Sequence, residues 1–191
     1  MPSLGELAAL ARLYEEHRPR LLAMLERRID PALAVRLDAE DLLAEVYIEA
    51  RRRWPKFRER ADLPGYVWLY GIARDRLIHA WRKNTTEGRT FDREMPWPER
   101  SSVQLGLGLV QNQAGPASAA ERQDLGRQMQ AALRRLRDAD REVLWMRHYD
   151  ELAFADIAAV NGISENTATV RYVRALRRLK ALWLETHGSD P

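Results

Sequence analysis

Basic side chains gather near the C-terminal end of the chain, at a spacing that suits phosphate binding. Residues 166–184 contain no acidic side chain, and spacings of three and four residues place the arginines on neighbouring stripes of one helix. The bases are Arg171, Arg174, Arg177, Arg178 and Lys180. One guanidinium group can donate two hydrogen bonds to the oxygens of one phosphate. The segment therefore predicts binding to a polyanion such as DNA. The alternative is a solvated basic helix on an ordinary bundle.

Leu152–Trp183 supplies the elements that would position these arginines. A short helix is expected over Phe154–Val160, and Asn161-Gly162 then ends it, because both residues tolerate a positive φ. Ser164 is a good N-cap for the next helix. One apolar stripe of that helix consists of Ala168, Tyr172, Ala175, Leu179 and Leu182. The pattern is typical of a helix-turn-helix whose second helix enters the DNA major groove.

Residues 39–54 are predicted to form a helix whose charge changes sign along its length. Asp38 suits the N-cap, and Asp41 lies in the first turn, where a carboxylate faces exposed N–H groups. An acidic first half, including Glu45 and Glu49, precedes three arginines, an order that stabilises a helix dipole without any partner. The apolar side consists of Leu42, Leu43, Val46, Tyr47 and Ala50.

Aromatic and basic side chains alternate along the next predicted helix, Gly65–Lys83, which follows a charged loop from Pro55 to Pro64. Aromatic faces beside arginine and lysine are typical of surfaces that stack single-stranded bases. For Trp68 and Trp81, packing within the domain explains the residue type equally well. The side chains outside the apolar stripe are Trp68, Tyr70, Arg74, His79, Trp81, Arg82 and Lys83.

The remaining segments predict an all-α protein of two small helical domains. Leu4–Arg28 reads as helix, with Pro19 either starting a new helix or kinking the first one. Further helices are expected from about residue 118 to Leu136 and over Asp138–Tyr149. The domains are expected at residues 1–83 and 117–185, joined by a flexible linker at 84–116 that holds a weak helix near 101–111, and followed by a tail at 186–191.

Composition excludes several classes of protein. The chain of 191 residues has 31 Lys and Arg against 28 Asp and Glu, so the placement of charge is more informative than its total. There is no cysteine, and the four histidines are far apart, so neither a metal site nor a cofactor is expected. No signal peptide, membrane span or catalytic motif is evident, which favours a non-enzymatic cytoplasmic protein.

Three segments together resemble the extracytoplasmic-function (ECF) group of the sigma-70 family of bacterial RNA polymerase sigma factors. LDAEDLLAEVYIEARRRWPKF (37–57) is similar to the family's DAEDLVQEVFLRAWRALDRF. LPGYVWLYGIARDRLIHAWRK (63–83) resembles FRAWLYRIARNLAIDYLRR. LRDADREVLWMRHYDELAFADIAAVNGIS (136–164) resembles LPPRQREVLLLRYLEGLSYEEIAEILGIS. The resemblance implies sigma region 2 followed by region 4, and a factor that directs core polymerase to promoters.

The resemblance also implies a role for named residues. Asp41, Leu42 and Glu45 match the positions that dock on the clamp helices of the largest polymerase subunit. Lys56 to Leu63 matches a loop that captures a base flipped from the −10 element. The implied −10 contacts are Lys56, Phe57, Arg58, Trp68, Tyr70, Arg74, His79, Trp81, Arg82 and Lys83. The implied −35 contacts are Thr167, Thr169, Val170, Arg171, Val173, Arg174, Arg177 and Arg178.

Departures from the family pattern affect individual contacts. Asp75 stands where asparagine is usual, and an acid is unfavourable beside a phosphate path. Thr169 stands where the family's recognition helix usually has a basic residue. An anti-sigma partner is common in the family, but no residue marks its docking site. The alternative function is a stand-alone helix-turn-helix regulator with an N-terminal dimerisation or sensing domain.

Overall fold

The computed structural model describes residues 4–29, 37–60, 63–86, 105–106 and 118–187. Over these ranges all regular secondary structure is helical, which confirms the predicted all-α class. The chain divides into two compact units, Met1–Met95 and Pro96–Pro191. Most of the predicted linker lies outside the described residues, so its boundaries stay a prediction.

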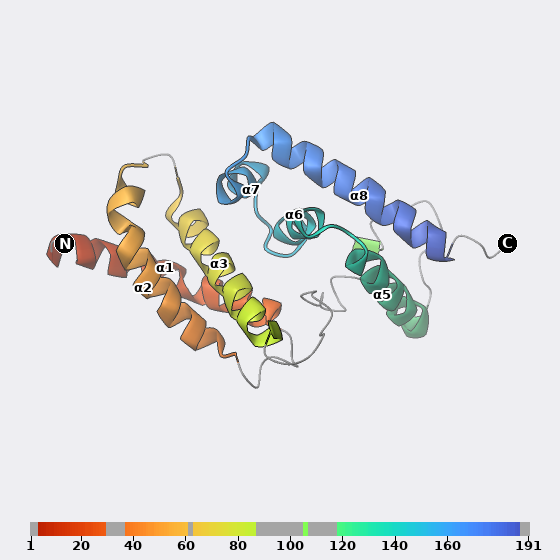
Figure 1. The fold of residues 1–191 in the computed structure, drawn as a ribbon, viewed down its shortest axis with the longest axis horizontal. Coiled ribbons are helices and arrows are strands. Elements are labelled where there is room, and N and C mark those ends of the chain that lie inside the picture. The colour runs from red at the N-terminus through yellow and green to blue at the C-terminus, as the bar shows by residue number, and fades with distance from the viewer. Residues whose placement is uncertain (1–3, 30–36, 61–62, 87–104, 107–117, 188–191) are drawn as a thin grey trace. The chain divides into compact units, whose positions relative to one another are not determined.

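The N-terminal unit is a three-helix bundle of α1 (Leu4–Arg28), α2 (Ala39–Arg58) and α3 (Gly65–Thr86), in which each helix packs on the other two (Figure 1). Helix α1 runs through Pro19, so no new helix starts there. The helices bury the apolar stripes read from the sequence. Core side chains include Leu10, Leu21, Met24, Leu43, Val46, Ala50, Leu69, Ile72 and Leu77.

The start of α3 approaches α1 closely. A Cβ added at Gly65 would collide with the Leu13 side chain, so a residue without a side chain is required for this packing unless Leu13 shifts. Pro64 precedes α3, and its carbonyl accepts the first helical hydrogen bond, from Trp68, at 3.1 Å. The start of α3 is therefore fixed both by backbone hydrogen bonding and by contact with α1.

Helix α2 is longer than the sequence predicted. The expected loop from Pro55 is wrong over its first residues, because α2 continues to Arg58 and includes Lys56 and Phe57. Proline lacks an N–H and removes one backbone hydrogen bond. Trp54, only 6 % exposed, and Phe57 pack against Trp68 of α3, and this contact favours the additional helical turn.

The C-terminal unit contains α5 (Ala119–Arg134), α6 (Asp138–His148), α7 (Phe154–Asn161) and α8 (Glu165–His187), with α8 packed on the other three (Figure 1). These bounds agree with the predicted helices to within a few residues. Ser118 and Glu121 form a capping box at the start of α5. Of the weak helix expected near 101–111, only Leu105 and Gly106 are described; both are buried.

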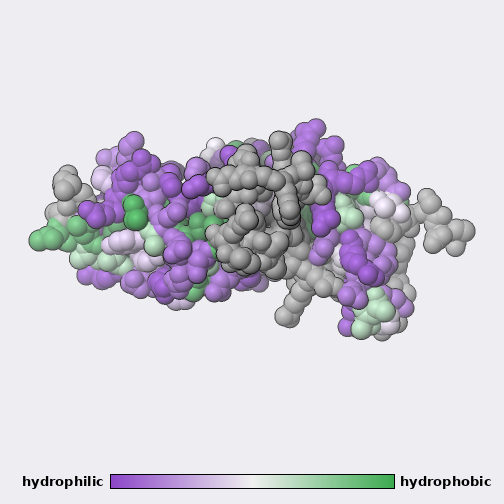
Figure 2. All heavy atoms as spheres, turned by 60° about the horizontal axis from the view of Figure 1, so that its bottom comes forward, coloured by the Kyte–Doolittle hydropathy of each residue, from purple (hydrophilic) through white to green (hydrophobic). Residues whose placement is uncertain are grey.

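Hydrophilic side chains cover most of the described surface visible in Figure 2, and hydrophobic side chains appear in small separate patches. Large apolar side chains that remain exposed therefore stand out. They are Leu4, Ile48, Val170, Val173 and Leu184. Ile48 lies on α2 and the two valines on α8, the helices for which the sequence predicted partners.

Candidate nucleic-acid and protein interfaces

The turn between α7 and α8 has the geometry that the sequence predicted. Gly162 ends α7 in the left-handed conformation, with φ 63° and ψ 35°. The Ser164 Oγ accepts a hydrogen bond from the Thr167 N–H at 3.1 Å, which confirms Ser164 as a side-chain cap of α8. Ala168, Ala175 and Leu179 are fully buried against the bundle. This packing fixes which side of α8 faces outward.

The outward side of α8 carries two neighbouring stripes. One lines a groove of about 500 Å³ beside the start of α6, where Arg137 and Asp140 form the other wall. Its α8 residues are Thr167, Val170, Arg171, Arg174 and Arg178. The other predicted −35 residues, Thr169, Val173 and Arg177, do not line this groove. The predicted set therefore spans both the groove and the adjacent exposed surface.

The arginines of this groove have unneutralised charge. Arg137, Arg171, Arg174 and Arg178 form no ion pair with another described residue. Asp140 is the acidic residue among the groove's lining side chains. A surface with four guanidinium groups and one carboxylate attracts an anion with repeating charge, such as a nucleic-acid backbone.

The exposed side of α2 presents two acids and one apolar residue. Asp41, Glu45 and Ile48 follow at spacings of four and three residues, so they share a helical stripe. Ile48 is 68 % exposed. Leu42 is 2 % exposed and lines the groove between α2 and α3, so most of its side chain packs within its own unit and its contact with a partner stays a prediction. Ile48 was not among the predicted contacts, although its position outside the buried stripe could be read from the sequence.

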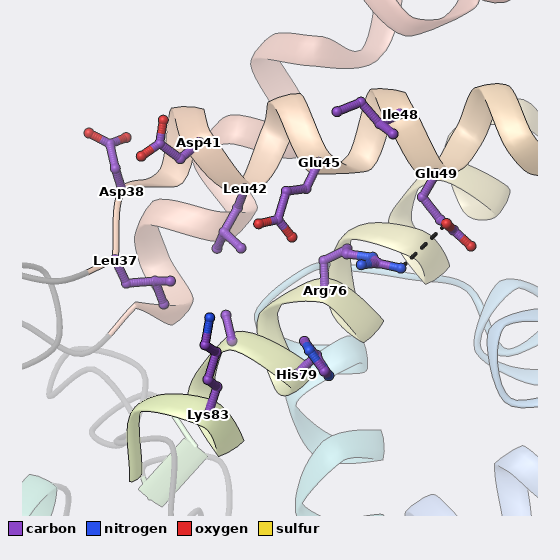
Figure 3. A pocket seen from close by; sticks show the side chains of 11 residues that line it. Leu37, Asp38, Asp41, Leu42, Glu45, Ile48, Glu49, Arg76, His79 and Lys83 are labelled. Atoms are coloured by element: carbon purple, nitrogen blue, oxygen red, sulfur yellow. Dashed lines mark ion pairs between the residues drawn. The ribbon is translucent and has the colours of Figure 1, made fainter. Parts of the chain in front are cut away.

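A groove of about 470 Å³ separates α2 from α3 and brings together residues that the sequence analysis placed in different sites (Figure 3). Asp41 and Glu45 were assigned to polymerase, whereas His79 and Lys83 were assigned to DNA. The α2 wall carries Asp38, Asp41, Glu45 and Glu49, and the α3 wall carries Arg76, His79 and Lys83. Because the carboxylates repel phosphate, this groove favours a protein partner that presents both signs of charge.

Glu49 is a buried acidic residue of α2, and the sequence did not predict its burial. It is 6 % exposed and accepts hydrogen bonds from Arg52, at 2.6 Å, and from Arg53, while Arg76 of α3 lies 3.4 Å away. Figure 3 shows Arg76 pointing from α3 toward Glu49. The hydrogen bond from Arg52 lowers the pKa of Glu49 below its ordinary value, against the opposing effect of burial. Glu49 therefore ties α2 to α3.

Aromatic residues meet where α2 ends and α3 begins. The rings of Phe57 and Trp68 are stacked, with centroids 4.1 Å apart and planes inclined by 12°, and Trp54 packs beside both. Phe57 and Trp68 are half-buried. Trp68 therefore packs within the domain and also keeps part of its ring exposed to solvent. Lys56 and Arg58 are exposed in the same turn of α2, and Arg58 pairs with Glu6 of α1.

A second group of predicted strand contacts lies farther along α3. Trp81 is half-buried, and Arg82 and Lys83 are exposed in the same turn. Trp81 follows Trp68 by thirteen positions along α3, a rise of about 20 Å at 1.5 Å per residue. Arg74, with 14 % of its side chain exposed, pairs with Asp75 at 3.2 Å. The predicted −10 residues therefore form two separate groups.

The position of Tyr70 disfavours its predicted contact with the melted −10 strand. Tyr70 is fully buried, and its hydroxyl accepts a hydrogen bond of 2.5 Å from the guanidinium of Arg28, itself 1 % exposed. A ring in this position has no face for an incoming base. Tyr70 was assigned by its residue type among other aromatics, whereas Arg28, at the end of α1, was not recognised as its partner.

Over the described residues, no group of three or more metal-ligating side chains occurs. In the same ranges, no helix is both long and apolar enough to cross a membrane.

Comparison with known proteins agrees with this architecture. Residues 13–87 match the family model of sigma-70 region 2, and residues 126–179 match that of sigma-70 region 4. The chain is 31% identical over 179 residues to the ECF RNA polymerase sigma factor SigD of Mycobacterium tuberculosis, covering 92% of this chain and 77% of the relative. It is 27% identical over 173 residues to RpoE of Cereibacter sphaeroides, an ECF sigma factor, covering 91% of this chain and 85% of that protein.

The chain therefore belongs to the ECF sigma factors of the sigma-70 family, which are transcription initiation factors. Region 2 corresponds to the bundle of α1, α2 and α3, and region 4 includes the helix-turn-helix. The match to region 2 disfavours the alternative of a stand-alone regulator with a separate dimerisation or sensing domain. Membership implies RNA polymerase and promoter DNA as partners.

Proposed function

We propose that this sigma factor divides promoter recognition between its two units. Helix α8 reads the −35 duplex, the aromatic groups of α2 and α3 hold the melted −10 strand, and the outer side of α2 docks on the clamp helices of the largest polymerase subunit. The factor acts in the cytoplasm, without a cofactor or catalytic chemistry of its own. The observation that carries this proposal is the unneutralised arginine face of α8, oriented by the Gly162 turn.

In the −35 complex, α8 lies in the major groove and its two stripes take different roles. Outside the groove beside α6, Val173 contacts a thymine methyl group and Arg177 reaches base edges. Val170, which lines that groove and like Val173 is 38 % exposed, contacts a second methyl group. Arg171 and Arg174 bind phosphates or guanine edges from the groove side. This arrangement uses apolar and charged side chains together, which suits a mixed sequence of bases.

In the −10 region, the two aromatic groups of the N-terminal unit hold different parts of the opened strand. The stacked pair of Phe57 and Trp68, beside Lys56, offers an aromatic face for an extruded base. Trp81 and Arg82 offer a second stacking and phosphate-binding position about 20 Å along α3. Extruding a base costs a few kcal/mol, and such contacts offset it.

At the polymerase, Asp41 and Glu45 set register and Ile48 supplies apolar contact. Paired charges at the rim of an interface contribute more to specificity and association rate than to affinity. An exposed apolar side chain among acids is suited to a pocket on the partner, where burial contributes most of the binding energy. The α3 residues His79 and Lys83 face the same groove and belong with this interface more than with the DNA strand.

The proposal is tested by pull-down with core RNA polymerase followed by run-off transcription. Asp41→Ala combined with Glu45→Ala should weaken core binding while leaving the binding of isolated duplex DNA unchanged. The matched control removes two exposed acids from α1, Glu15→Ala with Glu16→Ala, and should retain core binding. Unchanged core affinity for the α2 variant, or equal loss in both variants, would contradict the docking assignment.

Trp81 tests the assignment of the melted strand. Trp81→Ala should reduce formation of the open promoter complex more than formation of the closed complex, because the ring stacks only on unpaired bases. Permanganate footprinting measures opening, and a mobility-shift assay of the same holoenzyme measures closed-complex binding. Equal effects on both steps would assign Trp81 to packing instead.

A further inference from the structure

We infer that Arg137, at the start of α6, extends the DNA-binding surface of the C-terminal unit beyond the recognition helix by binding a backbone phosphate together with Arg171, Arg174 and Arg178. The inference rests on the proposed role of α8 in duplex binding, and it adds a residue that the sequence analysis did not single out. Its ligand is the sugar-phosphate backbone of duplex DNA, bound independently of base sequence.

The position of Arg137 carries the first step. Its backbone is the N-cap of α6, with φ −66° and ψ 147°, and its side chain makes no capping hydrogen bond to that helix. The side chain is exposed, forms no ion pair with another described residue, and lines the groove of about 500 Å³ opposite α8. The guanidinium is thus neither neutralised nor used for the local fold.

The spacing of the α8 residues carries the second step. Thr167, Arg171, Arg174 and Arg178 follow at intervals of four, three and four, so they form one stripe facing α6. Val173 and Arg177 lie on the neighbouring stripe, outside the groove. When that neighbouring stripe faces the bases, the groove stripe faces one edge of the major groove. The phosphates of one strand lie along this edge, within reach of both walls.

Asp140 provides a second residue with which phosphate binding in this groove can be tested. It lies one turn after Arg137 and lines the same groove, where its carboxylate repels a phosphate. Because Arg137 attracts a phosphate and Asp140 repels it, substitutions at the two positions should change duplex affinity in opposite directions.

The test measures the affinity of the full chain for two short duplexes of unrelated sequence over a series of KCl concentrations. Arg137→Ala should lower affinity equally for both duplexes and reduce the salt slope by about 1, the value for one lost phosphate contact. Arg137→Lys should restore the slope, because it keeps the charge. Asp140→Asn should raise affinity for both duplexes. The matched control, Arg122→Ala on α5, removes an exposed arginine outside the groove and should change neither quantity.

The outcomes separate this inference from the proposed function. If Arg137→Ala leaves affinity and slope unchanged while Arg171→Ala with Arg174→Ala lowers both, the extension onto α6 is wrong and the role of α8 stands. If neither variant changes binding, the assignment of α8 to duplex DNA is wrong as well. Circular dichroism melting of each variant identifies any loss of fold, and the lysine variant then decides whether charge or packing is responsible.

Discussion

The arginine face of α8 and the Glu49 cluster of α2 and α3 differ in what their charged side chains contact. On α8, Arg171, Arg174 and Arg178 form no ion pair with another described residue. In the N-terminal unit, the single carboxylate of Glu49 on α2 pairs with three arginines: Arg52 and Arg53 of α2 and Arg76 of α3. Side chains that pair within the bundle fix the positions of helices, whereas unpaired ones keep their charge for a partner. The same residue types thus hold helices together around Glu49 and are proposed to bind DNA on α8.

The largest expected effect separates packing from docking on α2. Leu42→Ala removes a side chain that is 2 % exposed and should lower the free energy of unfolding by roughly 2–5 kcal/mol. Ile48→Ala should change stability by less than about 0.5 kcal/mol, because the side chain is 68 % exposed. Urea unfolding of the full chain measures both changes.

Polymerase binding by the same two variants should reverse their order. Ile48→Ala should weaken the complex with core polymerase by about 1–2 kcal/mol, as expected for an apolar residue at the centre of an interface. Leu42→Ala, measured under conditions where it is folded, should bind nearly as well as wild type. A folded Leu42→Ala that binds poorly would support the polymerase contact that the resemblance implies for Leu42.

Next in size is the loss of duplex binding when the arginine face of α8 is removed. Arg171→Ala and Arg174→Ala should each weaken −35 binding by about 1–3 kcal/mol if they meet base edges, or reduce the salt slope by about 1 if they meet phosphates. Fluorescence anisotropy over a salt series distinguishes the two. Arg134→Ala, in the last turn of α5, is the matched control. An unchanged slope and affinity would remove both arginines from the site.

The sequence was most informative where one helix could be interpreted by itself. The Asp38 and Ser164 caps, the Gly162 turn and the buried stripe of α8 all follow from local propensity and period. Helix pairing could not be read in this way. Asp41 and Glu45 line the same groove as His79 and Lys83 only because of the way α2 packs against α3. The apolar stripe of each helix, taken by itself, does not specify that packing.

Corrections in the N-terminal unit have the same cause. Pro55 reads as a helix end by local rules, yet packing of Trp54 and Phe57 on Trp68 extends α2 past it. Tyr70 resembles its aromatic neighbours in type, but its hydroxyl meets Arg28 forty-two residues away. Contacts between distant segments decided both cases.

A smaller effect concerns the pH dependence of the tie between α2 and α3. The pKa of Glu49 is lowered in the folded protein, chiefly by the hydrogen bond from Arg52. The stabilisation is therefore fully present above the unfolded-state pKa of about 4.3 and is lost as the pH falls through the lower folded-state pKa. Glu49→Gln should remove this part of the acid sensitivity and cost about 1 kcal/mol at neutral pH, because solvent at Arg52 screens the pair.

Thermal unfolding from neutral pH down to pH 3 measures the Glu49 effect. The matched variant, Glu45→Gln, removes an exposed carboxylate one turn earlier on the same helix and so controls for the loss of one negative charge. Identical pH profiles for wild type and Glu49→Gln would show that the Glu49 cluster does not contribute to acid sensitivity.

The smallest effect lies in the helix-turn-helix and tests whether its stability is separable from its charge. Ala153 occupies the N-cap of α7 with φ −67° and ψ 157°, a conformation that suits a capping side chain, yet it makes no side-chain hydrogen bond. Ala153→Ser should add the cap that Ser118 and Ser164 provide for α5 and α8, raising the free energy of unfolding by roughly 0.5–1 kcal/mol. Because Ala153 does not line the arginine groove, duplex affinity and salt slope should remain those of wild type. Ser164→Ala is the reciprocal variant and should lower stability by a similar amount. A gain in stability accompanied by weaker duplex binding would show that DNA recognition requires the start of α7 to remain loosely held.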